Sequence, residues 1–145
     1  MDLDFKFNAE GLIPAIVQQI LISKKHHYGR VLMMGWMNKD SIEQSLAKGF
    51  MHYWSRSRNK LWLKGETSGN VQKIVRWFVD CDRDTLLFYV EQKGSACHSG
   101  SESCFFSELD IREGMVPSPK EFLAVEEKRG GAPEKENEGK PAVLC

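Results

Sequence analysis

Residues 71–90 read VQKIVRWFVDCDRDTLLFYV, and this stretch decides the fold. Two apolar runs, 71–79 and 85–90, stand on either side of an acidic centre at 80–84. Short apolar runs of this length are typical of buried strands. We therefore predict two strands around the acidic centre.

Two more strands are predicted upstream. Residues 12–22 (LIPAIVQQILI) form an apolar run with Pro14 near its start, where a strand tolerates proline. Residues 31–37 form a second apolar run. The polar stretch 23–30 between these runs is predicted as a loop.

One short helix is predicted over residues 40–48. Asp40 stands three residues before Glu43, which resembles a capping box. Apolar residues then follow at helical spacing, and Gly49 suits the end of a helix.

Residues 50–55 and 61–64 are predicted as strands that flank a basic turn at 56–60. Residues 65–70 (GETSGN) are predicted as a glycine-bounded loop. Mostly strands with one helix indicate an α+β, mainly β fold.

The chain of 145 residues, 41% of them apolar, is suited to one domain with one core. We predict this domain over residues 1–116 and a polar tail over 117–145. Residues 126–141 are rich in Glu, Lys, Gly and Pro. They lack the apolar surface that offsets the entropy of ordering, so the tail is predicted to be disordered.

The net charge gives no support to some classes of partner. Lys+Arg and Asp+Glu are each 20, so nothing favours a nucleic-acid or membrane-surface role, which needs a positive field. No basic region followed by an apolar run opens the sequence, so no signal peptide is predicted. We expect a cytoplasmic protein whose four cysteines are thiols or metal ligands rather than disulfides.

The acidic centre is a candidate metal site. On a strand, Asp80, Asp82 and Asp84 would share one face, with Cys81 and Arg83 on the other. Three carboxylates without partners repel one another, and such oxygen clusters suit Mg²⁺ or Ca²⁺. The alternative is a solvated acidic turn.

Three cysteines are candidate zinc ligands. Cys81, Cys97 and Cys104 are spaced C-x15-C-x6-C, and three protein ligands leave zinc an open position for water. The alternative is three unconnected buried thiols. Three thiolates would give the site a net charge near −1 and weaken the pull of the metal on water, so a general base would help. His98 is the candidate, although it could equally be a packing or ligand-orienting histidine.

The same strand geometry leads to a hypothesis about assembly. If Cys81 faces away from the carboxylates, one chain does not bring all these groups into one pocket. A zinc site shared across a dimer resolves this, with Cys81 from one chain and Cys97 and Cys104 from the other.

Basic and aromatic side chains alternate around the predicted turn at 56–60. They are Trp54, Arg56, Arg58, Lys60, Trp62 and Lys64. Arginine binds phosphate oxygens through forked hydrogen bonds, and aromatic rings stack on bases. The loop 65–70 can present N–H groups to an anion. The alternatives are an exposed hairpin with a basic wet face and a plain turn.

Taken together, these segments resemble the phosphoribosyl-AMP cyclohydrolase family over residues 8–108. Several ordered motifs at consistent spacings carry the resemblance. They are GLIPA at 11–15, WMN at 36–38, YWSRSR at 53–58, LWLKGETSGN at 61–70, DCDRD at 80–84, ACHSG at 96–100 and SCF at 103–105.

The resemblance implies a cytoplasmic homodimeric hydrolase of histidine biosynthesis that uses Zn²⁺ and Mg²⁺ and opens the adenine ring of phosphoribosyl-AMP. It implies Asp80, Asp82 and Asp84 as Mg²⁺ ligands. It also implies that Cys81 is given to the zinc site of the partner, which Cys97 and Cys104 complete. We assign proton transfer to His98. The candidates for binding the two phosphates are Arg56, Arg58, Lys64, Ser68, Gly69 and Asn70.

Two other functions remain open from the residues alone. One is a module that binds single-stranded RNA through the tryptophans and arginines at 54–62, although the zero net charge and the acidic centre oppose it. The other is a structural zinc or redox-sensing protein that uses the same thiols.

Overall fold

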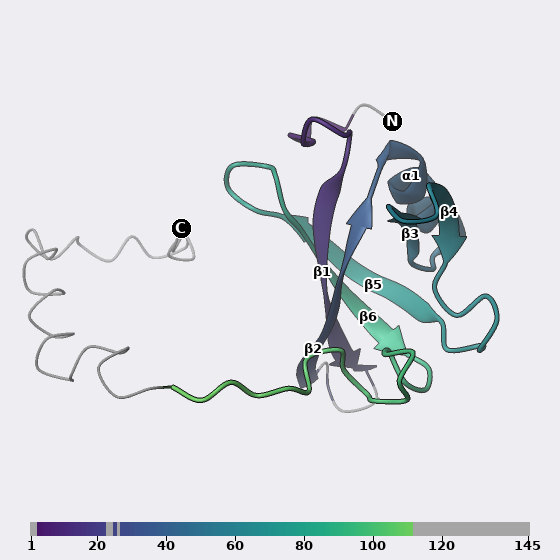
Figure 1. Cartoon of the computed structure of the whole chain (residues 1–145), viewed down its shortest axis with the longest axis vertical. Helices are drawn as coiled ribbons and strands as arrows, with labels where there is room; N and C mark the ends of the chain where they lie inside the picture. Colours follow the sequence, from purple (N-terminus) through teal and green to yellow (C-terminus); the bar gives the residue numbers. More distant parts are fainter. Residues whose placement is uncertain (1–2, 23–24, 26, 112–145) are drawn as a thin grey trace, which may run out of the picture. The chain divides into compact units, whose positions relative to one another are not determined.

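Strand β1 (Ile13–Leu21) is one of the two central strands of a four-stranded sheet. Figure 1 shows the chain as a computed structural model, which describes residues 3–22, 25 and 27–111. The sheet has the order β2-β1-β6-β5, with β2 at His27–Met37, β5 at Gln72–Val79 and β6 at Leu86–Gln92. β1 is antiparallel to β2 and parallel to β6, and β5 is antiparallel to β6.

All four strands predicted for this sheet are confirmed, but β2 begins earlier than expected. His27 and Tyr28 lie in the stretch predicted as a loop, and they pair with Leu21 and Ile20 of β1. The Tyr28 ring also packs against the Tyr89 ring, with centroids 5.0 Å apart. Backbone pairing and this aromatic contact extend β2 into a segment whose polar sequence favours a loop.

Helix α1 (Lys39–Lys48) confirms the predicted helix but has a different N-cap. The Asn38 side chain accepts a hydrogen bond from the Ser41 N–H at 2.9 Å, and the Ser41 hydroxyl accepts one from the Asn38 N–H at 2.8 Å. This is a capping box in which serine replaces the usual glutamate. The expected box of Asp40 and Glu43 is therefore wrong, because the helix begins before Asp40.

A two-stranded sheet follows the helix. Gly49 ends α1 with a φ of 77°, as predicted, and β3 (His52–Ser55) then pairs with β4 (Lys60–Leu63). The predicted hairpin around the basic turn is thus confirmed. One helix with two sheets confirms the α+β, mainly β fold.

The core lies between one face of the four-stranded sheet and the helix with its hairpin. In Figure 1, α1, β3 and β4 lie together on one side of this sheet. Tyr53 of β3 packs closely on β2, because a Cβ atom at Gly35 would come within 2.5 Å of the Tyr53 ring. The most deeply buried members of the core are Ile13, Ala15, Val17, Leu32, Met37, Ile42, Met51, Tyr53, Leu86, Phe88, Val90 and Ala96.

The opposite face of the four-stranded sheet carries apolar side chains in contact with solvent. Ile16 is in register with Met34 on one side and with Leu87 on the other, and Leu87 is in register with Phe78. Ile16 is 38% exposed, Met34 44% and Phe78 38%. These four residues form an apolar row across all four strands, which we call the open-face row.

The chain divides into two units, residues 1–106 and 107–145. The predicted domain boundary at 116/117 and the predicted tail lie outside the described residues. Within the part of the chain that the structure describes, no helix has the length and apolar character needed to cross a bilayer.

Candidate active site

A cleft of about 370 Å³ lies between the loop that follows β4 and the loop that follows β6. It brings together predicted site residues from segments far apart in the sequence. They are Arg58, Lys64, Ser68, Asn70, Cys97 and His98. Cationic, hydroxyl and amide groups from the first loop thus share one space with the thiol and imidazole groups of the second.

The loop after β4 is shaped by two glycines that pack on Asn70. Gly65 has a φ of 83°, and a Cβ atom there would lie 2.5 Å from the Asn70 carbonyl carbon. Gly94 has a φ of 65°, and a Cβ atom there would lie 2.3 Å from the Asn70 side-chain oxygen. Only glycine combines a left-handed backbone with this close approach.

The N–H groups of this loop are used within the loop itself. The Gly69 N–H donates to the Gly65 carbonyl oxygen at 2.8 Å, and the Asn70 N–H donates to the Ser68 hydroxyl at 3.2 Å. The expectation that backbone N–H groups of the loop 65–70 face an anion is therefore not met at Gly69 and Asn70. The loop presents side chains to the cleft instead.

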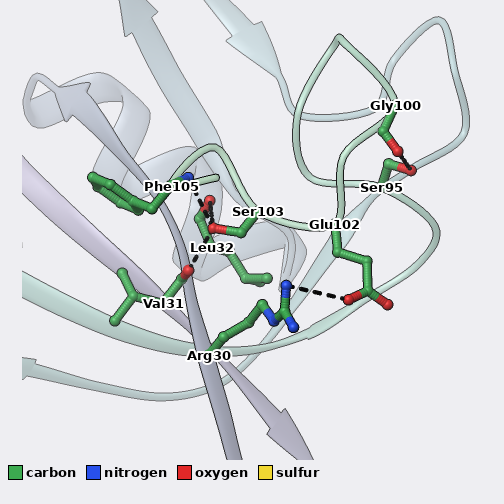
Figure 2. A network of polar contacts seen from close by, with 8 residues as sticks. All are labelled: Arg30, Val31, Leu32, Ser95, Gly100, Glu102, Ser103 and Phe105. Atoms are coloured by element: carbon green, nitrogen blue, oxygen red, sulfur yellow. Dashed lines mark hydrogen bonds and ion pairs between the residues drawn. The ribbon is translucent and has the colours of Figure 1, made fainter. Parts of the chain in front are cut away.

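The loop after β6 folds back on itself and is fastened to β2. The Cys97 N–H donates to the Ser101 carbonyl oxygen at 3.1 Å. The Ser103 hydroxyl donates to the Val31 carbonyl oxygen at 2.8 Å, and the Cys104 N–H donates to the Leu32 carbonyl oxygen at 2.7 Å. Figure 2 shows the Ser103 contact to Val31, with a nearby ion pair between Arg30 and Glu102 at 3.5 Å. Cys104 is therefore anchored to the main sheet, and Cys97 is held within the loop that leads to it.

The thiols of Cys97 and Cys104 lie beside each other and are not disulfide-bonded. The Ser99 hydroxyl donates to the Cys97 sulfur at 3.0 Å, which holds the pKa of the Cys97 thiol below its usual value. Partial burial and the neighbouring Cys97 raise the pKa of the Cys104 thiol. The Lys64 ammonium acts to lower the pKa of both thiols. Cys97 and Cys104 therefore lie together, while their assignment as zinc ligands stays a prediction.

The carboxylates of Asp80, Asp82 and Asp84 also converge, with ligand oxygens within 4.8 Å of one another. They lie in an exposed turn between β5 and β6, so the expected strand with alternating faces is wrong. The turn forms because the Asp80 carboxylate accepts hydrogen bonds from the N–H groups of Asp84 (3.0 Å) and Thr85 (3.1 Å), while Arg83 has a φ of 66°. This hydrogen-bonded turn, and not the alternation of side chains along a strand, brings the three carboxylates together.

The close approach of the carboxylates shifts the pKa values of Asp80 and Asp82 in opposite directions. Desolvation opposes ionisation of Asp80, but hydrogen bonds from Thr85, Asp82 and Asp84 outweigh it and lower the Asp80 pKa. The hydrogen bond with Asp80, slight desolvation and repulsion by Asp80 and Asp84 raise the Asp82 pKa. Such a cluster favours a divalent cation, which would offset the repulsion.

The acidic turn and the cleft lie at opposite ends of β6. Asp84 stands just before β6 and Ser95 just after it. Figure 1 shows the turn between β5 and β6 and the loop after β6 at opposite ends of β6. Seven strand residues span roughly 20 Å. Cys81 is therefore remote from the other two cysteines of the same chain. The strand-face argument for this separation is wrong, and the length of β6 is the actual reason.

Two of the predicted phosphate-binding residues, Gly69 and Arg56, do not line the cleft, and Arg56 belongs to another surface. Its guanidinium lies over the Trp36 ring, 5.0 Å from the centroid, and it lines a different hollow with Trp54 and Asn59. Arg58, two residues on, reaches the cleft because the chain reverses direction between β3 and β4.

The sequence of these segments matches a known enzyme family. The sequence model of the phosphoribosyl-AMP cyclohydrolase family matches residues 33–106, which contain the cleft, the thiol pair and the acidic turn. The chain belongs to the phosphoribosyl-AMP cyclohydrolase family. The enzyme class predicted from the motifs is thereby confirmed.

Individual members of the cyclohydrolase family are similar over most of their length. The phosphoribosyl-AMP cyclohydrolase of Acidiphilium cryptum is 57% identical over 110 residues, covering 76% of this chain and 89% of the relative. That of Chlorobaculum tepidum is 56% identical over 110 residues, covering 76% of each chain. That of Paracoccus denitrificans is 53% identical over 110 residues, covering 76% of this chain and 84% of the relative.

The donor groups of this cyclohydrolase fit the two metals that the family resemblance implies. Adjacent thiols are soft ligands that suit zinc, whereas an oxygen cluster suits magnesium. Cys97 and Cys104 supply two thiols, one fewer than a three-ligand zinc site needs. Among the described residues, the trio of Asp80, Asp82 and Asp84 is the one group of three ligands within reach of a single ion.

Sequence reasoning missed two serines that support the thiol pair of this cyclohydrolase. Ser99 donates to the Cys97 sulfur, and Ser103 fastens the segment before Cys104 to β2. Hydroxyls one or two residues from a candidate metal ligand are a usable signal, because they can bond to the ligand or to nearby backbone.

Proposed function

We propose that this protein hydrolyses the N1–C6 bond of the adenine ring of phosphoribosyl-AMP, giving the ring-opened formimino imidazole carboxamide ribotide. This is the third step of histidine biosynthesis, and we place it in the cytoplasm. The observation that best supports this function is the cleft, which Arg58 and Asn70 line together with Cys97 and His98. Such a space suits a phosphorylated base whose reacting carbon lies near the thiol.

Zinc is proposed to bind Cys97 and Cys104 together with Cys81 of the partner subunit. Bound there, it would act as a Lewis acid that lowers the pKa of a water molecule. His98 is exposed in the cleft and directly follows Cys97, so it can accept the proton of that water. Hydroxide formed there would add to C6, and collapse of the adduct would break the N1–C6 bond. His98 would give its proton to N1, and the hydroxyl proton would pass to the exocyclic nitrogen, which leaves C6 as a carboxamide.

Arg58, Ser68 and Asn70 are proposed to hold phosphate oxygens. Arg58 supplies a planar fork of donors, and the other two supply a hydroxyl and an amide from the loop that ends at Asn70. Arg56 lies outside this cleft, so a role for it requires the second phosphate to extend toward another surface. The Gly69 N–H is already bonded, so Gly69 contributes the shape of the loop.

Mg²⁺ is proposed at Asp80, Asp82 and Asp84, where three exposed carboxylates already crowd together. The ion would offset their repulsion and fix the turn that carries Cys81. Mg²⁺ bound beside Cys81 would thereby order the turn that offers Cys81 to the zinc site proposed in the partner subunit.

A homodimer is proposed for two reasons. The length of β6 keeps Cys81 away from Cys97 and Cys104 of its own chain. The open-face row of Met34, Ile16, Leu87 and Phe78 offers an apolar surface for a second copy. In a two-fold dimer each chain would give one Cys81 and receive one, which yields two equivalent sites.

The test is ring opening of phosphoribosyl-AMP followed by ultraviolet absorbance. Zinc-stripped protein and Cys97→Ser are expected to lose nearly all activity. His98→Asn is expected to keep its zinc and slow roughly 10²- to 10⁴-fold. Lys73→Met changes an exposed lysine that does not line the cleft, and serves as the matched control with unchanged activity. Wild-type rates in the stripped and Cys97→Ser samples would overturn the zinc mechanism, and an inactive wild type would overturn the function itself.

A further inference from the structure

The Lys64 side chain lies against the thiol loop instead of extending into solvent. Its ammonium donates a hydrogen bond to the Ala96 carbonyl oxygen, at 2.5 Å. Ala96 is 1% exposed and directly precedes Cys97. This contact joins the end of β4 to the segment that carries the first thiol of the cleft.

Lys64 is held both at its backbone and at its ammonium group. Its backbone N–H donates to the carbonyl oxygen of the buried Met51 at 3.0 Å. Its ammonium lies 5.8 Å from the centroid of the Trp62 ring, whose face attracts cations. The Trp62 ring in turn packs on Tyr53, with centroids 5.2 Å apart. The core therefore directs this lysine toward the thiol loop.

Charge gives the contact a chemical meaning. Lys64 is close enough to act electrostatically on both Cys97 and Cys104. A zinc ion with three thiolates carries a net charge near −1, and a fixed ammonium beside it offsets that charge. Removal of a group that orients or neutralises a metal ligand typically lowers metal affinity roughly 10- to 100-fold.

We propose that Lys64 is a positioning residue for the Cys97–Cys104 thiol pair, rather than a ligand of the substrate phosphates. It holds the Ala96 carbonyl, and with it the turn that presents Cys97, and it supplies the positive charge that a thiolate-bound metal requires. This inference rests on the proposed zinc chemistry and departs from the phosphate role that the sequence indicates for Lys64. Arg58 remains the cation available to phosphate.

The test compares Lys64→Met, which keeps the apolar stem and removes the charge, with Lys64→Arg, which keeps the charge. Lys73→Met is the matched control, because Lys73 is an exposed strand lysine that does not line the cleft. Zinc affinity is measured by competition with a chromogenic chelator. Amide hydrogen exchange at Ala96, Cys97 and Gly100 is measured on zinc-free protein, since these N–H groups bond within the loop.

Lys64→Met is expected to lower zinc affinity roughly 10- to 100-fold and to speed exchange at these three amides. Lys64→Arg is expected to retain most of the affinity, and Lys73→Met to match the wild type. At saturating zinc, the KM of Lys64→Met should change less than its zinc affinity. Wild-type zinc affinity or wild-type exchange in Lys64→Met overturns the proposal, as does a raised KM alone. A wild type that binds no zinc defeats the proposed zinc chemistry, and the exchange data then decide the anchoring role separately.

Discussion

Gly65 illustrates how much of the site depends on single residues. Its backbone is left-handed, and the Asn70 backbone fills the space where a side chain would begin. The sequence marks residues 65–70 as a loop because glycines bound it, and that prediction is confirmed. The packing of Asn70 between Gly65 and Gly94 could not be predicted, because Gly94 joins the loop only through the tertiary fold.

We predict that Gly65→Ala destabilises the protein by about 2–4 kcal/mol, from left-handed strain plus the displacement of the Asn70 backbone. Gly11→Ala is the matched control. Gly11 has a φ of 73°, but no atom lies within 4 Å of the point that a Cβ atom would occupy, so this variant bears the strain alone, about 1–2 kcal/mol. Urea unfolding of both variants measures the difference, and equal losses would contradict the packing argument.

At the scale of elements, apolar runs predict strands well, whereas short polar segments do not reveal their ends. The strands at 12–22 and 71–79 are confirmed because hydrophobic burial determines them. The cap of α1 differs from the prediction, since Ser41 completes a box that the sequence pattern assigns to glutamate. The acidic centre fits a strand by its sequence alone, because nothing in the sequence says that Asp80 accepts hydrogen bonds from the residues that follow it.

A buried chain of side-chain hydrogen bonds connects β3, β5 and β6 to the cleft. The Tyr53 hydroxyl donates to the Gln72 side-chain oxygen at 2.6 Å, and the Gln72 amide donates to the Gln92 side-chain oxygen at 2.8 Å. The Gln92 amide then donates to the Asn70 carbonyl oxygen at 3.3 Å. The cleft loop is thus tied to the core through polar groups that apolar patterning does not identify.

Tyr53 gives this network a pH dependence. Burial, with a smaller contribution from Cys104, raises the pKa of Tyr53 well above its usual value of about 10. The pKa of Tyr53 is higher in the folded state than in the unfolded state. The stability that the neutral Tyr53 side chain contributes is therefore fully present below about pH 10 and is lost as the pH rises above it. Tyr53→Phe should cost about 1–3 kcal/mol at pH 7, because it leaves the Gln72 oxygen unsatisfied, and should lose less stability than wild type above pH 10. Denaturant unfolding of both proteins at pH 7 and pH 11 measures the two effects. An equal loss of stability between pH 7 and pH 11 in wild type and in Tyr53→Phe would contradict the role given to Tyr53.

At the scale of the whole molecule, the sheet separates Cys81 from the two thiols with which we propose that it binds zinc. Cys81 stands at one end of β6 and the cleft at the other. The family resemblance predicts the ligand set from the sequence, but the structural argument for a site shared between two chains comes only from the length of β6. The open-face row likewise depends on registers between four strands, which no local pattern specifies.

We predict that Ile16→Glu weakens dimer formation at least tenfold, about 1.4 kcal/mol, because a two-fold interface places the charge in the contact twice. Leu61→Glu is the matched control, since Leu61 is 36% exposed on β4, outside the open-face row. Sedimentation velocity over a dilution series measures the change. A dimer unaffected by Ile16→Glu, or a monomeric wild type, would contradict this assignment of the interface.

The central claim is that Cys97 and Cys104 of one chain and Cys81 of its partner hold one zinc ion. Subunit mixing tests it most directly. Cys81→Ser and Cys97→Ser proteins, each inactive alone, are unfolded together in equal amounts and refolded with zinc. Random pairing restores one intact site in half of the dimers, so we predict that activity and bound zinc return to roughly a quarter of wild type. A mixture that stays as inactive and as zinc-poor as its two components would contradict the account.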